Sequence, residues 1–438
     1  RPVFRLHSLP LILVSGFAGA IALGTLLLVL PWASEEGTWT SPVTAFFVTT
    51  SAVCVTGLAP VDTASHWSHF GEAVILVLIQ FGGLGFMAST TLLFLLFGWR
   101  VGVRERLFLS SSLDLSRPGG IVRLTRRAIL FTFIFESVGF VLLSVRFAFD
   151  QPVITALWHG LFNSISAFNN AGFDLSGNST SLEGTRDVFV LAPIGALVIA
   201  GGIGYLVFED LLQRRRRLSL DSTLVLWTTA ALILVSWPIV SVLEWDGALA
   251  GLSFPDKLLQ AGFHAASSRT SGFATLPVGD FREETQVFTM ALMFIGGASG
   301  STAGGIKVAT FAILVATVVT AIRGRAHIEV AGREIRRSEA DKALAVAALG
   351  IMVVFSVSVL LAILEEHPFL ALLFEVVSAA GTTGLSTGIT ADHADPSLIL
   401  LSVTMFMGRL GPLTLALLLV QRGQPDRIRL PEERVRIG

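Results

Sequence analysis

Charged residues are scarce in this sequence of 438 residues, since Asp, Glu, Lys and Arg together make up only 14% of it. Soluble globular domains carry about 25% charged residues, so the composition excludes an ordinary water-soluble domain and a disordered chain. The single cysteine, Cys54, excludes an intramolecular disulfide and a cysteine-based metal centre. The 31 basic and 32 acidic residues nearly cancel, so nucleic acid is not an expected partner.

Apolar residues are abundant, at 53% of the chain, and the mean hydropathy is +0.73. A helix needs about 20 mostly apolar residues to span a bilayer. Eight segments meet this requirement: Leu9–Trp32, Ala73–Trp99, Ala128–Phe149, Val188–Phe208, Ser222–Leu243, Thr285–Ile322, Ala343–Leu364 and Pro396–Val420. The sequence therefore predicts an all-α membrane protein with eight transmembrane helices, surrounded by membrane lipids.

The basic residues are distributed unevenly. Of the 31 Lys and Arg residues, 24 lie at the two termini and in three connections, Arg100–Arg127, Arg214–Arg217 and Arg323–Lys342. Because connections rich in Lys and Arg stay in the cytoplasm, we expect both termini to be cytoplasmic in a multi-pass plasma-membrane protein. The Arg214–Arg217 run is interpreted as a topology anchor, and a docking or anionic-lipid surface is the alternative.

On the side opposite the basic clusters, each pair of predicted spans encloses a second apolar stretch that is too short to cross the bilayer. These stretches are Pro42–Ala52, Val153–Ala167, Pro255–Ser267 and Pro368–Ala379. They run into four related motifs, SAVCVTGL, SAFNNAGF, ASSRTSGF and SAAGTTGL. Four copies in register predict four helix–pore-loop–helix repeats, at residues 1–115, 116–217, 218–335 and 336–438, the last including a cytosolic tail.

The glycine in each motif indicates a bend at membrane depth. Non-helical backbone survives there only where it is buried in protein or lines a wet cavity. Four re-entrant segments that enter from one face satisfy this by meeting around a central pore in a pseudo-fourfold arrangement. Glycine lets the preceding carbonyls face inward, and rings of carbonyl oxygens can replace the hydration shell of a cation.

The predicted selectivity-filter residues carry mostly small, neutral side chains, which favours a dehydrated monovalent cation over a divalent one. They are Val55, Thr56, Gly57, Asn170, Ala171, Gly172, Thr270, Ser271, Gly272, Thr382, Thr383 and Gly384. The alternative is that the four glycines only allow close packing of helices.

At these residues the chain resembles the Trk/Ktr/HKT superfamily of potassium transporters, and within it the KtrB-type subunits. The resemblance extends to Gln80–Met87, Gly201–Asp210, Met293–Val308 and Met405–Thr414. It implies potassium as the transported ion, preferred through a glycine in all four filters, with sodium as an activator. It also implies a homodimer with one pore per subunit, gated by cytosolic nucleotide-binding RCK subunits of the KtrA type. The sequence has no dinucleotide-binding fingerprint, so we expect no organic cofactor on this chain.

A glycine-rich stretch interrupts the third repeat's second span. Glycine costs about 1 kcal/mol relative to alanine in a helix, so this stretch is expected to be a loop. It comprises Gly296, Gly297, Ala298, Ser299, Gly300, Ser301, Thr302, Ala303, Gly304 and Gly305. The resemblance implies an intramembrane gate below the filter, and a simple helix kink is the alternative.

Several charges fall at membrane depth, where they usually mark a pathway or a buried pair. Lys307 is assigned to the gate, and Arg409 is expected to form a barrier to cations below the filter. A structural ion pair of Arg409, with Glu136 or Glu209, is the alternative. Arg269 and Glu375 are expected to point away from the axis and to brace the filter loops.

These features predict bacterial potassium uptake through a gated, passive pathway. The main alternative is a symporter with alternating access that couples potassium to sodium or protons, because such proteins also use broken helices at the midplane. A membrane-embedded enzyme is disfavoured, since the sequence lacks metal-ligand or nucleophile motifs such as HExxH and GxSxG.

Overall fold

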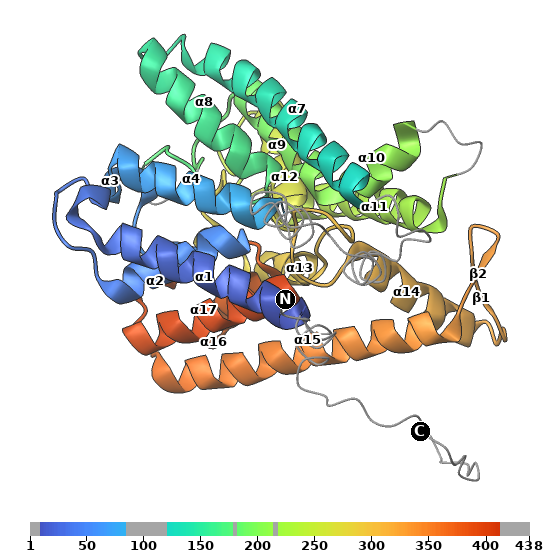
Figure 1. The fold of residues 1–438 in the computed structure, drawn as a ribbon. Coiled ribbons are helices and arrows are strands. Elements are labelled where there is room, and N and C mark those ends of the chain that lie inside the picture. Colours follow the sequence, from blue (N-terminus) through green and yellow to red (C-terminus); the bar gives the residue numbers. More distant parts are fainter. Residues whose placement is uncertain (1–8, 85–120, 178–181, 213–217, 412–438) are drawn as a thin grey trace.

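A computed structural model gives the fold of residues 9–84, 121–177, 182–212 and 218–411. These ranges are mainly helical, and their only named strands, β1 (Ile328–Val330) and β2 (Arg333–Ile335), form a small antiparallel hairpin. The helix α15 (Arg337–Leu364) runs along one side of the molecule, and the hairpin lies near its first residues (Figure 1). The described part of the chain is thus a helical assembly, as the sequence predicts.

Twelve of the helices fall into four sets of three, each consisting of a first helix, a short second helix and a third helix. The sets are α1 (Leu9–Val29), α2 (Pro42–Cys54) and α4 (His69–Gly83); α7 (Ile121–Phe147), α8 (Val153–Phe168) and α9 (Val188–Ile203); α11 (Leu220–Leu243), α12 (Phe254–Ser267) and α13 (Glu283–Phe294); and α15, α16 (Phe369–Gly381) and α17 (Asp395–Leu410). In every set the first helix packs against the short second helix.

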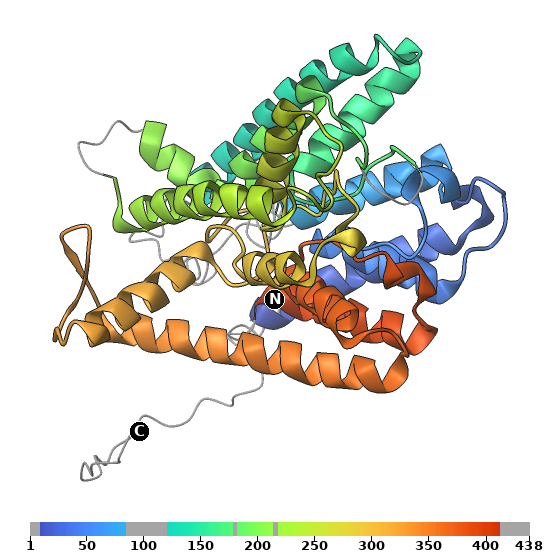
Figure 2. The same ribbon diagram turned by 180° about the vertical axis from the view of Figure 1, so that it is seen from behind.

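The short helices also connect neighbouring sets. The helix α8 packs against α4, α12 against α9, α16 against α13, and α2 against α17 of the last set. These contacts run around the molecule and return to their starting point, and Figures 1 and 2 show the short helices from opposite sides. The short helices therefore join the four sets into a closed circuit of packing contacts.

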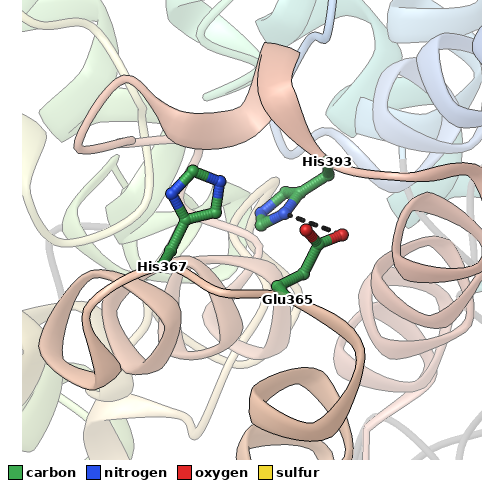
Figure 3. A group of neighbouring side chains, drawn as sticks. All are labelled: Glu365, His367 and His393. Carbon is green, nitrogen blue, oxygen red and sulfur yellow. Dashed lines mark ion pairs between the residues drawn. The ribbon is translucent and has the colours of Figure 1, made fainter.

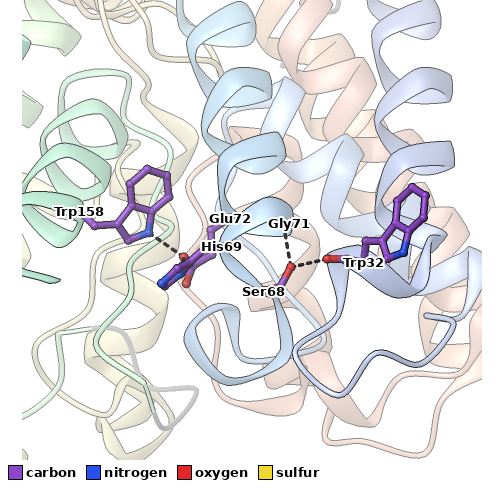
Figure 4. Close-up of polar contacts among 6 residues, drawn as sticks. All are labelled: Trp32, Ser68, His69, Gly71, Glu72 and Trp158. Carbon is purple, nitrogen blue, oxygen red and sulfur yellow. Dashed lines mark hydrogen bonds and ion pairs between the residues drawn. The ribbon is translucent and has the colours of Figure 1, made fainter. Parts of the chain in front are cut away.

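A polar cluster at the start of α4 fixes one of these junctions. Trp158 on α8 donates through Nε1 to the Glu72 carboxylate at 2.7 Å, and His69 Nδ1 lies 2.9 Å from the same oxygen (Figure 4). Ser68 caps α4, because its hydroxyl accepts from the Gly71 amide and donates to the Trp32 carbonyl. The buried Glu72 carboxylate therefore links the first set of helices to the second.

The remaining named elements are short or follow the sets. They are η2 (Pro31–Ala33), α3 (Thr63–His66), α10 (Tyr205–Leu212), η4 (Val278–Asp280), α14 (Val308–Ile322) and η5 (Ile389–Asp392). The helix α14 packs against α11 and α15 and leads into the β hairpin.

Many apolar side chains of α7 face outward, although Leu143 is buried. Leu130, Phe133, Ile134, Val138 and Val141 are each more than half exposed, whereas Thr132, Glu136 and Ser144 of the same helix are buried. A contiguous exposed apolar stripe is unfavourable in water and suits a hydrocarbon environment. The distribution indicates a helix whose apolar face meets lipid and whose polar face meets protein.

One of the eight predicted spans is bent in the structure, in addition to the interrupted span Thr285–Ile322. The helices α7, α11 and α15 are each long and apolar enough to cross a membrane. The predicted span Val188–Phe208 is two helices, α9 and α10, bent by 87°. The bend lies at Gly204, and the carbonyls of Gly201 and Gly202 accept from the amides of Thr302 and Ala298 instead of continuing the helix.

Other predicted features extend past the described ranges. The spans Ala73–Trp99 and Pro396–Val420 correspond to α4 and α17 as far as Gly83 and Leu410, and their remaining portions lie largely or wholly outside those ranges. The Arg214–Arg217 run, most of Arg100–Arg127 and both termini also lie outside them. The same applies to the repeat boundaries at residues 115 and 217.

Candidate ion-binding ring and loop

The short helices end in bends of similar backbone geometry. Val55, Asn170 and Thr382 have left-handed φ angles of 56°, 58° and 49°, whereas Thr270 at the equivalent place in the third bend does not. Two residues further on, every bend has a glycine with positive φ: Gly57 (94°), Gly172 (72°), Gly272 (73°) and Gly384 (94°). Left-handed backbone favours glycine, which explains why the residue is present in all four motifs.

The four bends meet one another in the interior. Each glycine lies against the carbonyl oxygen of the residue that precedes the glycine of another bend. A Cβ atom added to Gly57 would lie 2.5 Å from the Ala171 oxygen, and one added to Gly172 would lie 2.7 Å from the Ser271 oxygen. A Cβ atom added to Gly272 would lie 2.5 Å from the Thr383 oxygen, and one added to Gly384 would lie 2.0 Å from the Thr56 oxygen. The contacts form a closed ring, and no side chain fits at any of its glycines without displacing backbone.

One serine anchors each bend. The hydroxyls of Ser51 and Ser378 accept from the amides of Gly57 and Gly384 at 3.0 Å. The hydroxyls of Ser166 and Ser267 instead donate to the carbonyls of Phe173 and Phe273 at 2.5 Å. All four serines are buried, so the bends are held by local hydrogen bonds that are shielded from solvent.

An acidic cavity lies on one side of the ring. Its volume is about 290 Å³, and all four glycines line it together with residues shortly after them in the sequence. Asp62, Asp174, Glu183 and Asp280 line the same cavity, whereas no Lys, Arg or His does so among the described residues. Carboxylates gathered in a concave site raise the local concentration of cations.

On the other side of the ring lies the glycine-rich loop. The helix α13 ends at Phe294 and α14 begins at Val308, so the segment Gly296–Gly305 is not helical, as its glycine content predicts. The loop is closed at its base, since the Gly296 amide donates to the Ile306 carbonyl at 2.8 Å. The Thr302 hydroxyl donates to the Phe168 carbonyl at 3.2 Å, at the end of α8. The loop therefore lies against residues that precede the ring glycines.

Two basic side chains hold this loop. Arg409 on α17 donates through Nη1 to the Thr302 carbonyl and through Nη2 to the Gly82 carbonyl near the end of α4. Lys307 donates to the Ala303 carbonyl at 2.7 Å. Arg409 thus connects the loop to two helices that come from different sets.

Neither predicted ion-pair partner of Arg409 serves that role. Glu136 accepts from Gln80 at 3.3 Å and from Asn169 at 2.9 Å, and Glu209 pairs with Arg127 at 2.7 Å. The ion-pair alternative with these two carboxylates is therefore wrong. Both side chains have other partners at the junctions between helices.

Two further buried charges brace the surroundings of the ring. Arg269 donates to the Gly296 carbonyl at 3.3 Å. Glu375 on α16 accepts from the hydroxyl of Ser386 and, at 3.0 Å, from that of Thr390. Both therefore contact the chain around the bends, as the sequence predicts for bracing residues.

Loss of the Glu375 brace is expected to destabilise the protein. Glu375→Ala removes the acceptor of the half-buried Ser386 hydroxyl and one of the two acceptors of the buried Thr390 hydroxyl. A buried polar group that loses its partner costs about 1–3 kcal/mol. The midpoint of thermal unfolding in detergent should fall by several degrees. Glu366→Ala, at an exposed position in the connection before α16, is the control and should not change the midpoint. Equal midpoints for both variants would contradict the bracing role.

Comparison with known proteins identifies the family. The profile of TrkH, described as cation transport protein, matches residues 20–426. The chain belongs to the TrkH family. Its relatives include the Ktr system potassium uptake protein B of Bacillus subtilis, 38% identical over 98% of this chain and 96% of that protein. The protein of the same name from Vibrio alginolyticus is 34% identical over 98% and 95% of the two chains. The potassium/sodium uptake protein NtpJ of Enterococcus hirae is 33% identical over 98% and 96%.

The fold is also that of a TrkH structure. The crystal structure of the potassium transporter TrkH from Vibrio parahaemolyticus matches with a TM-score of 0.76 and 18% identity, covering 96% of this chain and 86% of that chain. Members of the TrkH family are ion transporters rather than enzymes. Together with the apolar helices, this family assignment makes the chain a multi-pass membrane protein.

Some residues at this site of the TrkH-family chain are not predicted by the sequence. Glu183 and Asp280 line the acidic cavity, yet neither lies in a motif. The side-chain amide of Asn169 donates to both Gln80 and Glu136. The only sequence signal for these contacts is the position of Asn169 within SAFNNAGF. Such contacts join residues far apart in sequence, so no spacing reveals them.

Proposed function

We propose that this chain carries potassium ions into the cell through the ring of bends, which acts as a selectivity filter. The closed circuit of contacts among Gly57, Gly172, Gly272 and Gly384 is the observation that carries the proposal. The backbone carbonyls of Thr56, Ala171, Ser271 and Thr383, with those of the residues before them, stand in for water around a dehydrated ion. The remaining proposed filter residues are Val55, Asn170, Thr270 and Thr382.

The arrangement of helices around the ring supports the same function. We propose four helix–pore-loop–helix repeats, at residues 1–115, 116–217, 218–335 and 336–438, in pseudo-fourfold order. The short helices end at the bends, so their partially negative C-terminal ends lie near the ring. Together with the acidic cavity, they favour a cation and disfavour an anion.

The glycine-rich loop is the proposed gate. It lies on the side of the ring opposite the acidic cavity, and Arg409 ties it to α4. Release of the hydrogen bonds to Thr302 and Gly82 would free the loop to move from the pathway. Residues 296–305, Lys307 and Arg409 make up this gate in our proposal.

The proposed assembly and regulation of the chain are based on the names of its relatives. The names of the Bacillus subtilis and Vibrio alginolyticus proteins assign them to a Ktr system, which implies a second component. We propose a homodimer in the bacterial plasma membrane, with cytoplasmic termini and a cytosolic nucleotide-binding RCK-type partner. The name of the Enterococcus hirae relative includes sodium, and sodium-dependent transport is proposed accordingly.

A symporter with alternating access is the second candidate. The observation that favours it is the pair of broken helices, α9–α10 with its 87° bend and α13–α14 with its loop, which contact each other through Gly202 and Ala298. Transporters of that class bind substrate at discontinuous helices. The closed ring favours a fixed pathway, because alternating access would have to open and reclose its contacts in every cycle.

Cation flux into proteoliposomes distinguishes the two candidates. The full chain is reconstituted with a potassium gradient, with and without sodium, and the membrane potential is varied. A passive pathway gives potassium flux that reverses at the potassium equilibrium potential, with sodium altering only its rate. A fixed ratio of sodium to potassium moved would establish the symporter instead, and absence of any cation flux would overturn both.

A further inference from the structure

Three side chains with metal-binding groups lie close together near the start of α16, the fourth short helix. Glu365 and His367 lie in the connection between α15 and α16, and His393 follows η5. One carboxylate oxygen and one nitrogen from each imidazole all lie within 4.8 Å of one another. Figure 3 shows the three side chains directed toward a common space between the two connections.

His393 is the unusual member of this group. Its side chain is 0% exposed, yet neither ring nitrogen makes a hydrogen bond within the described part of the chain. Nδ1 lies 3.5 Å from Oε1 of Glu365, which already accepts from the Ala394 amide at 2.8 Å. His367 meets the His393 ring edge-on, with centroids 5.8 Å apart, and so satisfies neither nitrogen. A buried polar group without a partner is costly, which points to a missing ligand.

We propose that Glu365, His367 and His393 bind a divalent transition-metal ion of the Zn²⁺ type. Imidazole nitrogen and carboxylate oxygen are preferred zinc ligands, and two His with one carboxylate leave a fourth position for water. Zinc–ligand bonds of about 2.0–2.2 Å place tetrahedral ligand atoms roughly 3.3 Å apart. The three ligand atoms, which lie within 4.8 Å of one another, would therefore move slightly closer together when the ion binds. Glu365 and His367 lie outside helices, which permits this adjustment. Ca²⁺ and Mg²⁺ prefer all-oxygen ligand sets and do not match the group.

The ion would join two connections at the wall of the acidic cavity. Thr390, three residues before His393, lines that cavity and donates to the Glu375 carboxylate. A metal bound to His393 therefore restrains η5, the segment that follows the fourth bend. The proposal concerns metal binding alone, so it does not depend on which cation crosses the membrane.

Calorimetric titration tests the site. The full chain, purified in detergent without a polyhistidine tag, is titrated with ZnCl₂, and its thermal midpoint is measured with and without the ion. We expect one Zn²⁺ per chain and a higher midpoint, with no effect of MgCl₂. His367 is only partly buried, so His367→Ala should fold normally. Loss of an outer-shell partner alone weakens metal binding by up to about 100-fold, so removal of this direct ligand should weaken Zn²⁺ binding by roughly 100-fold or more.

A second histidine provides the control. His327 is exposed and pairs with Glu334 on the β hairpin, so His327→Ala should leave Zn²⁺ affinity unchanged. Substitution of Co²⁺ adds a spectroscopic readout, since a tetrahedral site gives visible absorption that His367→Ala should remove and His327→Ala should retain. Equal Zn²⁺ affinity in the wild type and His367→Ala, or no stoichiometric binding, would overturn the proposal.

Discussion

Gly57→Ser is expected to reduce the preference for potassium over sodium by about tenfold, the factor that corresponds to about 1.4 kcal/mol of lost discrimination. An added Cβ at Gly57 meets the Ala171 carbonyl oxygen at 2.5 Å, so the ring must open at this point. A widened ring coordinates a dehydrated potassium ion less well, while a hydrated sodium ion passes more easily. Gly384→Ser should have a larger effect, because its Cβ would lie 2.0 Å from the Thr56 oxygen.

Gly388→Ser separates this effect from backbone strain. Gly388 has a φ of 97°, nearly that of Gly57, and it lines the same cavity, but an added Cβ would meet nothing within 4 Å. Relative permeabilities are measured in proteoliposomes with mixed potassium and sodium gradients. Selectivity should fall in the two ring variants and be retained in Gly388→Ser. Unchanged selectivity in a folded Gly57→Ser variant would refute the filter assignment.

Arg409→Ala is expected to raise potassium flux about tenfold or more. The guanidinium donates to the carbonyls of Thr302 and Gly82, and hydrogen bonds from charged donors each contribute about 1.5–3 kcal/mol. Their loss releases the loop from α4 and shifts the gate toward its open state. Deletion of residues 299–302 should raise flux in the same direction, because it removes the part of the loop nearest α8.

Arg409→Lys distinguishes a latch, in which the hydrogen bonds of Arg409 hold the loop in place, from an electrostatic barrier, in which its positive charge repels cations. Lysine keeps the positive charge but lacks the planar fork that reaches two carbonyls at once. If Arg409 acts as a latch, the lysine variant should resemble alanine and show raised flux. If it acts through its charge alone, the lysine variant should keep the low flux of the wild type. Flux of wild-type size in both Arg409→Ala and the loop deletion would contradict a gate at this position.

The sequence predicts the parts of the site that depend on local backbone chemistry. The four glycines mark bends because a left-handed conformation and a close carbonyl exclude a side chain at those positions. The loop at Gly296–Gly305 follows in the same way from the low helix propensity of its five glycines. The short helices agree with their predicted ranges to within two residues at either end.

Features that depend on contacts between distant segments were not predictable. The hydropathy of Val188–Phe208 indicates one span, and only the contact of Gly202 with the loop explains why it bends. The partners of Arg409 are backbone carbonyls, which carry no sequence signal, so the acidic partners considered for it, Glu136 and Glu209, are the wrong residues. Glu365 and His393 come together only because the segment after the fourth bend returns the chain to the connection between α15 and α16.

Diffraction from crystals soaked in rubidium, an anomalous scatterer close to potassium in size, is the most direct test of ion coordination by the backbone. The account predicts anomalous density on the axis of the ring, equidistant from the carbonyl oxygens of Thr56, Ala171, Ser271 and Thr383, which fades when sodium replaces rubidium. Density located only among the carboxylates of the outer cavity, or a ring that stays empty at saturating rubidium, would contradict it.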